Sequence, residues 1–103
     1  MYYISKILNN ISVINNIIND QNSGKVPIAE DYEKIIELDS SHPSFNDLSS
    51  NQSTVVLLYN KELVKYINKY KSGYDYNDEG KFIAESKQLA FNSSIYIATI
   101  FNN

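Results

Sequence analysis

The stretch that most constrains the fold is residues 81–101, KFIAESKQLAFNSSIYIATIF. Its apolar residues fall at helical spacing on one face, while Lys81, Glu85 and Gln88 fall on the other. The apolar face comprises Phe82, Ile83, Leu89, Ala90, Ile97, Ile100 and Phe101. Small residues that let neighbouring backbones come close are Ser86, Ala90, Ser93, Ser94 and Ala98. We therefore expect a helix over about 80–101, against which the other helices pack.

Two further stretches repeat apolar residues every three or four positions, which predicts helices over 2–20 and 54–71. The expected core stripe of the first is Ile4, Ile7, Leu8, Ile11, Ile14 and Ile18. That of the second is Val56, Tyr59, Leu63, Tyr66, Ile67 and Tyr70, with Ser53 as the expected N-cap. The run 54–59 also fits a buried strand, because short apolar runs are ambiguous, but its continuity with the later stripe favours a helix.

Residues 27–38 are expected to form a shorter helix. Pro27 suits its first position, and Glu30 and Asp31 suit its first turn, where carboxylates are favoured. The side chains expected to face inward are Ile28, Tyr32, Ile35 and Ile36. Residues 39–53 are rich in Ser, Asn and Asp, which favour turns, so we expect an irregular connection there with one helical turn over 43–48.

These elements predict an all-α fold. A chain of 103 residues is typical of one domain, so we expect a single helical domain over residues 1–103. Short connections make successive helices antiparallel. The prediction is an antiparallel four-helix bundle with helices over about 2–20, 27–38, 54–71 and 80–101.

The composition excludes several classes of site. The chain has no cysteine, which excludes disulfides, thiolate nucleophiles and cysteine-ligated zinc. The start MYYISKILNN lacks the pattern of a secretory signal, and no apolar run is long enough to span a membrane. We expect a cytoplasmic protein. The bias towards Asn, Ile, Lys and Tyr is typical of AT-rich genes, as in many mobile elements.

Residues for nucleophilic catalysis are scarce. His42 is the one histidine, and it stands in a loop between serines, where we expect it to be exposed to solvent. A catalytic triad is a spatial arrangement with an oriented base, which closeness in sequence does not supply. The three glycines are isolated, so no phosphate-binding glycine loop is present. We expect a protein without catalytic activity and without a cofactor.

Two acidic segments leave a metal site open as an alternative. Glu30, Glu33 and Glu37 share one face of the expected helix, although a solvated acidic surface is the simpler interpretation. Residues 75–86 have the outline of a calcium-binding loop between two helices. Its last position, which should be a bidentate glutamate, is Ser86, so a connecting turn is the better interpretation. We therefore predict no bound metal.

A lysine stripe supports a second alternative. Lys61, Lys65 and Lys69 recur every four residues, a spacing at which like charges repel. Lysines on phosphates and nearby tyrosines on bases would suit single-stranded nucleic acid. However, the chain has no arginine, the usual clamp for phosphate, and carries a net charge of −3. Nucleic acid is therefore the less favoured partner.

Val13 and Ile17 lie beside the main apolar stripe of the first helix. The simpler interpretation is that this helix is wedged between two neighbours. The alternative is that both side chains contact a partner or a second copy of the chain, so the oligomeric state stays open.

Acidic residues concentrate in two segments. Residues 30–47 hold six acidic residues and one lysine, and residues 75–79 hold three acidic residues beside two tyrosines. Tyrosine supplies rigid contact area, and complementary charge speeds the encounter with a basic protein. We expect a small inhibitor of a larger basic protein: an immunity protein or antitoxin that blocks a nuclease-type toxin, or a phage-encoded anti-defence inhibitor. The expected partner-binding residues are Glu30, Glu33, Glu37, Asp39, Asp47, Tyr74, Asp75, Tyr76 and Asp78.

Overall fold

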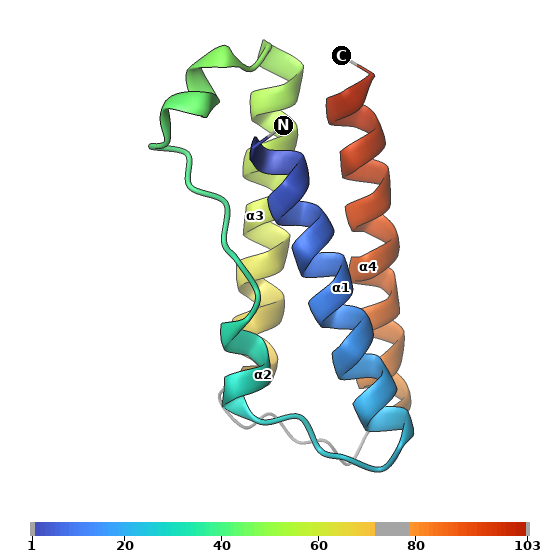
Figure 1. Cartoon of the computed structure of the whole chain (residues 1–103). Coiled ribbons are helices and arrows are strands. Elements are labelled where there is room, and N and C mark those ends of the chain that lie inside the picture. The colour runs from blue at the N-terminus through green and yellow to red at the C-terminus, as the bar shows by residue number, and fades with distance from the viewer. Residues whose placement is uncertain (1, 72–78, 103) are drawn as a thin grey trace.

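The computed structural model describes residues 2–71 and 79–102. Within them all regular structure is helical, so the predicted all-α fold is confirmed and residues 54–59 are helix, not strand. The helices are α1 (Tyr2–Asn22), α2 (Ala29–Glu33), α3 (Ser50–Lys71) and α4 (Glu79–Phe101), with a 3₁₀ helix, η1 (Pro43–Asp47), before α3 (Figure 1).

Helix α4 is the packing centre, as predicted. Its most extensive contacts are with α1, followed by those with α3. Helices α1 and α3 begin at one end of the bundle and α4 begins at the other, so α4 runs antiparallel to both (Figure 1). Ser86 and Ser93 of α4 are fully buried. Their small side chains let the neighbouring helices approach, which is the role predicted for them.

The second helix is shorter than predicted: it covers Ala29–Glu33 and not 27–38. A helix this short is marginal by itself. Its continuation would place Glu33 and Glu37 one turn apart, where like charges repel. The chain instead runs without helix from residue 34 to η1, beside α3 (Figure 1).

The extended backbone changes which side chains face inward. Tyr32 and Ile35 are buried as predicted, and Leu38 joins them. Ile28 and Ile36 are 56% and 37% exposed, so the prediction that they face inward is wrong. The reason is that an extended segment directs neighbouring side chains to opposite sides, whereas a helix would have gathered Ile35 and Ile36 near one face.

The helical turn predicted over 43–48 is confirmed as η1. Nδ1 of His42 accepts a hydrogen bond from the backbone N–H of Ser44 at 3.1 Å, which caps this turn. The imidazole also stacks on Tyr2 of α1, with 3.8 Å between ring centroids. His42 is therefore half-buried, and the expectation of an exposed loop histidine is wrong.

Helix α3 begins with a capping box that the sequence interpretation missed. The hydroxyl of Ser49 accepts the N–H of Gln52 at 3.2 Å, and Oε1 of Gln52 accepts the N–H of Ser49 at 2.9 Å. The amide of Gln52 also donates to the carbonyl of Ile100 at 2.8 Å, joining the start of α3 to the end of α4. Ser53, the predicted N-cap, lies inside the helix and donates to the carbonyl of Ser50.

Ser49→Ala is expected to lower the free energy of unfolding by about 1 kcal/mol, because it removes the cap acceptor. Ser53→Ala is the matched control and should change it by less than about 0.5 kcal/mol. Urea unfolding followed by circular dichroism compares the two. A larger loss in the Ser53 variant would contradict the capping box.

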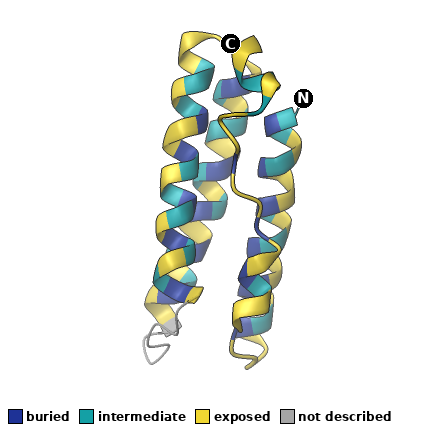
Figure 2. Ribbon diagram, turned by 90° about the vertical axis from the view of Figure 1, so that its left-hand side faces the viewer, coloured by how far each residue is buried: buried dark blue, intermediate teal, exposed yellow. Residues whose placement is uncertain are grey.

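The buried face of α1 differs in part from the predicted stripe. Ile7, Ile14 and Ile18 are buried as predicted, and Figure 2 shows buried positions recurring along the helices between exposed ones. Leu8 is 54% exposed, so its assignment to the core is wrong. Phe101, assigned to the apolar face of α4, is also exposed. The core of α1 is completed by Tyr3, Asn10, Ile17 and Gln21.

Val13 and Ile17 face neighbouring elements of the same chain. Ile17 is only 2% exposed, and the half-buried Val13 packs against the core. The simpler interpretation, a helix between two neighbours, is therefore correct for these two residues.

Candidate functional site

Five of the predicted partner-binding carboxylates lie in one segment, residues 30–47. We call Glu30, Glu33, Glu37, Asp39 and Asp47 the acidic strip, and all five are exposed. The segment runs from α2 at one end of the bundle to η1 at the other (Figure 1). It faces the viewer in Figure 2 and is exposed over most of its length. The carboxylates thus form a line and not the single helical face that was predicted for three of them.

The remaining predicted partner-binding residues lie outside the described residues. These are Tyr74, Asp75, Tyr76 and Asp78. The first four residues of the segment with the outline of a calcium-binding loop, 75–78, also lie outside them, and residues 79–86 belong to α4.

The buried carboxamide of Asn10 holds the strip segment against the bundle. Oδ1 of Asn10 accepts the backbone N–H of Ile36 at 2.7 Å, and its Nδ2 donates to the carbonyl of Ile36 at 2.8 Å. The same Nδ2 lies 3.3 Å from the hydroxyl of Tyr59 on α3. Asn10 is fully buried. It therefore replaces a neighbouring strand in satisfying both backbone groups of Ile36.

Three more side chains fix the same segment. Oδ1 of Asn60 on α3 accepts the N–H of Leu38 at 2.7 Å. The hydroxyl of Tyr3 donates to the carbonyl of Asp39 at 2.6 Å, and Asn9 donates to the carbonyl of Lys34 at 3.2 Å. Residues 34–39 are thus held against the bundle by hydrogen bonds from α1 and α3, and the backbone beneath Glu37 and Asp39 is fixed.

The strip carboxylates carry charge that nothing in the described part of the chain neutralises. None of the five is in an ion pair there. Oδ1 of Asp39 accepts the hydroxyl of Ser41 at 2.6 Å and its N–H at 2.9 Å. The hydroxyl bond, followed by the backbone bond, holds the pKa of Asp39 below its ordinary value. Asp39 therefore stays ionised at lower pH than a free aspartate.

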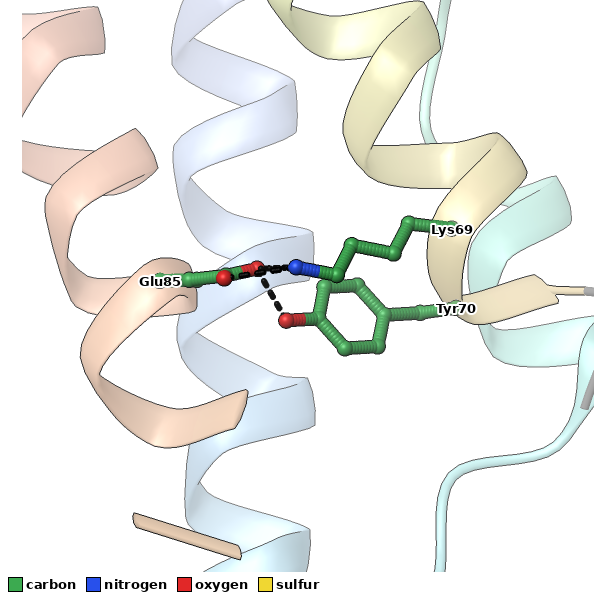
Figure 3. Close-up of polar contacts among 3 residues, drawn as sticks. All are labelled: Lys69, Tyr70 and Glu85. Atoms are coloured by element: carbon green, nitrogen blue, oxygen red, sulfur yellow. Dashed lines mark hydrogen bonds and ion pairs between the residues drawn. The ribbon is translucent and has the colours of Figure 1, made fainter. Parts of the chain in front are cut away.

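The lysine stripe is interrupted by an ion pair between α3 and α4. Nζ of Lys69 donates to the two carboxylate oxygens of Glu85 at 2.7 and 2.9 Å, and the hydroxyl of Tyr70 donates to the same carboxylate (Figure 3). Lys61 and Lys65 are exposed.

The tyrosines of the stripe are also unavailable. Tyr59, Tyr66 and Tyr70 are buried and therefore cannot stack on bases. The nucleic-acid alternative needed free lysines beside accessible aromatic rings. The structure does not present that arrangement on α3.

An open groove of about 260 Å³ lies between α3 and α4. Its lining includes the Lys69–Glu85 ion pair and Glu62. Glu62 accepts from Asn92 at 2.8 Å and from the hydroxyl of Tyr96 at 3.1 Å. Burial, then the hydrogen bond to Glu62, raises the pKa of Tyr96. Lys69 bonds to Glu85, and Glu62 bonds to Asn92 and Tyr96, so these polar side chains join α3 to α4.

The Glu85 cluster predicts a pH dependence of stability. Burial opposes ionisation of Glu85, but the hydrogen bonds from Lys69 and Tyr70 and the charges of Lys69 and Lys81 outweigh it, so its pKa lies below the ordinary 4.5. The contribution is therefore complete above pH 4.5 and is lost as the pH falls through the folded-state pKa. It is modest, because Lys69 and Glu85 are 30% and 34% exposed and solvent screens them.

Glu85→Gln should accordingly flatten the fall in unfolding free energy below pH 4.5. Lys69→Gln is the matched comparison, because it removes the ion pair from the other side, and it should reduce the same fall. Urea titrations at stepped pH measure both. Equal slopes in the wild type and the Glu85 variant would show that the cluster does not contribute.

Within the described residues, the alternative catalytic site at His42 and the alternative metal site at Glu30, Glu33 and Glu37 are not assembled. Nδ1 of His42 accepts a backbone N–H, and the hydroxyl of Ser41 donates to Asp39 and not to the imidazole. Glu37 lies beyond the end of α2, so the predicted face shared with Glu30 and Glu33 is wrong. Among residues 2–71 and 79–102, no group of three acidic or histidine side chains could hold a metal ion.

Two features of the strip segment were missed in the sequence: its attachment to Asn10 and the exposure of Ile28 and Ile36. Asn10 stands at helical spacing from Tyr3, Ile7 and Ile14, so a polar residue within the apolar stripe was the available signal. The local sequence does not indicate that Ile28 and Ile36 are exposed, because their exposure depends on where α2 ends.

Comparison of the chain with protein-family models, with curated proteins and with solved structures finds no match. Separately, none of the described helices combines the length and the apolar character needed to cross a membrane. Function is therefore inferred from the surface of this chain alone.

Proposed function

We propose that this protein is a non-catalytic inhibitor that binds a larger basic protein through the acidic strip. The observation that supports it is the presentation of the five carboxylates: they are exposed, lack ion-pair partners among the described residues, and lie on one segment. Unneutralised charge of one sign accelerates association with a surface of the opposite sign and fixes its register.

The fixed backbone strengthens the proposal. Because Asn10, Asn60 and Tyr3 already hold residues 34–39, binding costs little further ordering of the main chain. A flexible acidic tail would lose that entropy on binding. Glu37 and Asp39, which stand on this fixed backbone, suit a partner whose basic groups are themselves held in fixed positions.

A nuclease-type toxin is the class of partner that fits best, because its nucleic-acid-binding surface must be basic. In that setting the protein is an immunity protein or antitoxin acting in the cytoplasm, and the strip occupies the place of phosphates. A phage-encoded anti-defence inhibitor would use the same chemistry on a different nuclease. Both settings predict inhibition by occlusion, without turnover.

Affinity capture from the native host tests the proposal. The tagged protein is incubated with nuclease-treated lysate, and bound proteins are identified by mass spectrometry. Glu33→Gln with Glu37→Gln should remove a stoichiometric basic partner. The matched control is Asn15→Lys with Asn19→Lys, two exposed positions on α1 outside the strip.

Both pairs raise the net charge of −3 by the same two units, so they separate the position of charge from its amount. The control pair should retain the partner. Equal loss in both pairs would attribute capture to net charge. A parallel capture from untreated lysate that recovers nucleic acid and no stoichiometric protein would overturn the proposal.

A further inference from the structure

Two exposed isoleucines lie on the same segment as the unpaired carboxylates. Ile28 directly precedes α2 and is 56% exposed, and Ile36 follows it and is 37% exposed. Glu30 and Glu33 stand between them in the chain, and Glu37 follows Ile36. The strip segment is therefore a mixed surface of aliphatic side chains and carboxylates.

The backbone of each isoleucine is fixed on both sides. The N–H of Ile28 donates to Oδ2 of Asp31 at 2.8 Å, and its carbonyl accepts the N–H of Asp31 at 3.0 Å. The N–H and carbonyl of Ile36 both bond to Asn10, at 2.7 and 2.8 Å. Both apolar side chains are thus presented to solvent by main chain that has little freedom left to lose.

We infer that Ile28 and Ile36 are the apolar anchors of the interface, and that the partner presents a basic amphipathic surface with an apolar centre. This inference rests on the proposed function. Residues 30–47 carry six acidic residues and one lysine, which selects a basic occupant and disfavours nucleic acid. A purely ionic contact would leave both isoleucines in water, whereas burying preformed anchors supplies most of the affinity in protein interfaces.

Leu57 and Leu58 provide an internal comparison. They are 51% and 52% exposed on α3, close to the exposure of Ile28, and their nearest charged neighbour in the chain is Lys61. Electrostatic attraction therefore does not favour binding of a basic partner at these two leucines. Substituting them removes a similar exposed apolar area from a part of the surface outside the acidic strip, so they serve as matched controls.

A defined probe tests the inference. A synthetic peptide of lysine and leucine, about 18 residues or five helical turns long, places its leucines on one face. A second peptide has the same composition with the leucines scattered. Titration calorimetry against the full chain should show the first peptide binding at least about tenfold more tightly, since the two differ only in apolar presentation.

Ile28→Ser with Ile36→Ser should weaken binding of the amphipathic peptide by about tenfold or more, as loss of two anchors requires. Leu57→Ser with Leu58→Ser should change it by less than about twofold. All four positions are exposed, so both variants should still fold cooperatively, which thermal unfolding checks before the titrations. Equal weakening in both variants, or none in the isoleucine variant, would overturn the inference.

The variant pair Glu33→Gln with Glu37→Gln separates this inference from the proposed function. If peptide binding is lost in the glutamate pair but unchanged in the isoleucine pair, the acidic strip binds the peptide and the two isoleucines are not anchors. Binding unchanged in both pairs overturns both. A dimer in light scattering that the isoleucine pair converts to monomer would show that a second copy covers the anchors, which also overturns the inference.

Discussion

Asn10→Ala is expected to lower the free energy of unfolding by about 3 kcal/mol, because it leaves the N–H and carbonyl of Ile36 without partners beside a buried gap. The variant should be less stable as a whole, and residues 34–39 should also open more often. Residues 34–39 would keep the bonds from Asn9, Asn60 and Tyr3 but lose both bonds between Asn10 and Ile36. Urea unfolding measures the stability, and hydrogen exchange at the Ile36 amide measures the release of the segment.

Asn9→Ala is the matched control. Asn9 is the same residue type one position earlier, is exposed, and donates to the carbonyl of Lys34 at 3.2 Å. An exposed bond of this kind is replaced by water, so the change should stay within about 0.5 kcal/mol. If the two variants were equally stable, the buried carboxamide would not be what holds the acidic segment.

Ser93→Leu is expected to destabilise the fold by about 3 kcal/mol, because it inserts a large side chain into a closely packed core. Ser93 is fully buried on α4, and its hydroxyl donates to the carbonyl of Leu89 in the same helix at 2.7 Å. Its small volume and its side-chain hydrogen bond with Tyr59 of α3 both suit the close approach of these helices. Thermal unfolding measures the effect.

Ser94→Leu is the control for the same substitution one residue later. Ser94 is exposed, so a leucine there meets solvent and the change should stay within about 0.5 kcal/mol. A destabilised Ser94 variant, or a tolerant Ser93 variant, would contradict the close approach of the other helices to α4.

The acidic strip was predictable as a set of residues but not as a surface. The excess of carboxylates over residues 30–47 is visible in the chain, and their exposure follows from the cost of burying unpaired charge. Their arrangement depends on Asn10 and Asn60, which bond to residues 26 and 22 positions away in sequence. A local pattern carries no information about such distant partners.

For the lysine stripe, too, the sequence predicted the residues but not their partners. Its spacing on α3 was correct, yet Lys69 is committed to Glu85, sixteen residues later on α4. Whether a surface charge is available to a ligand depends on which helix lies opposite. That is decided by packing between α3 and α4 and not by the stripe itself.

Local sequence determined the three long helices, since their apolar period of three to four residues persists over five or more turns and cannot be satisfied by strands. It also determined the packing role of α4 through small residues such as Ser86 and Ser93. Tertiary structure alone decided where α2 ends. Beyond Glu33 the backbone could hydrogen-bond to itself as a helix or to the side chains of Asn10 and Asn60. Only the assembled bundle offers the second set of partners, and with it the extended, exposed acidic strip.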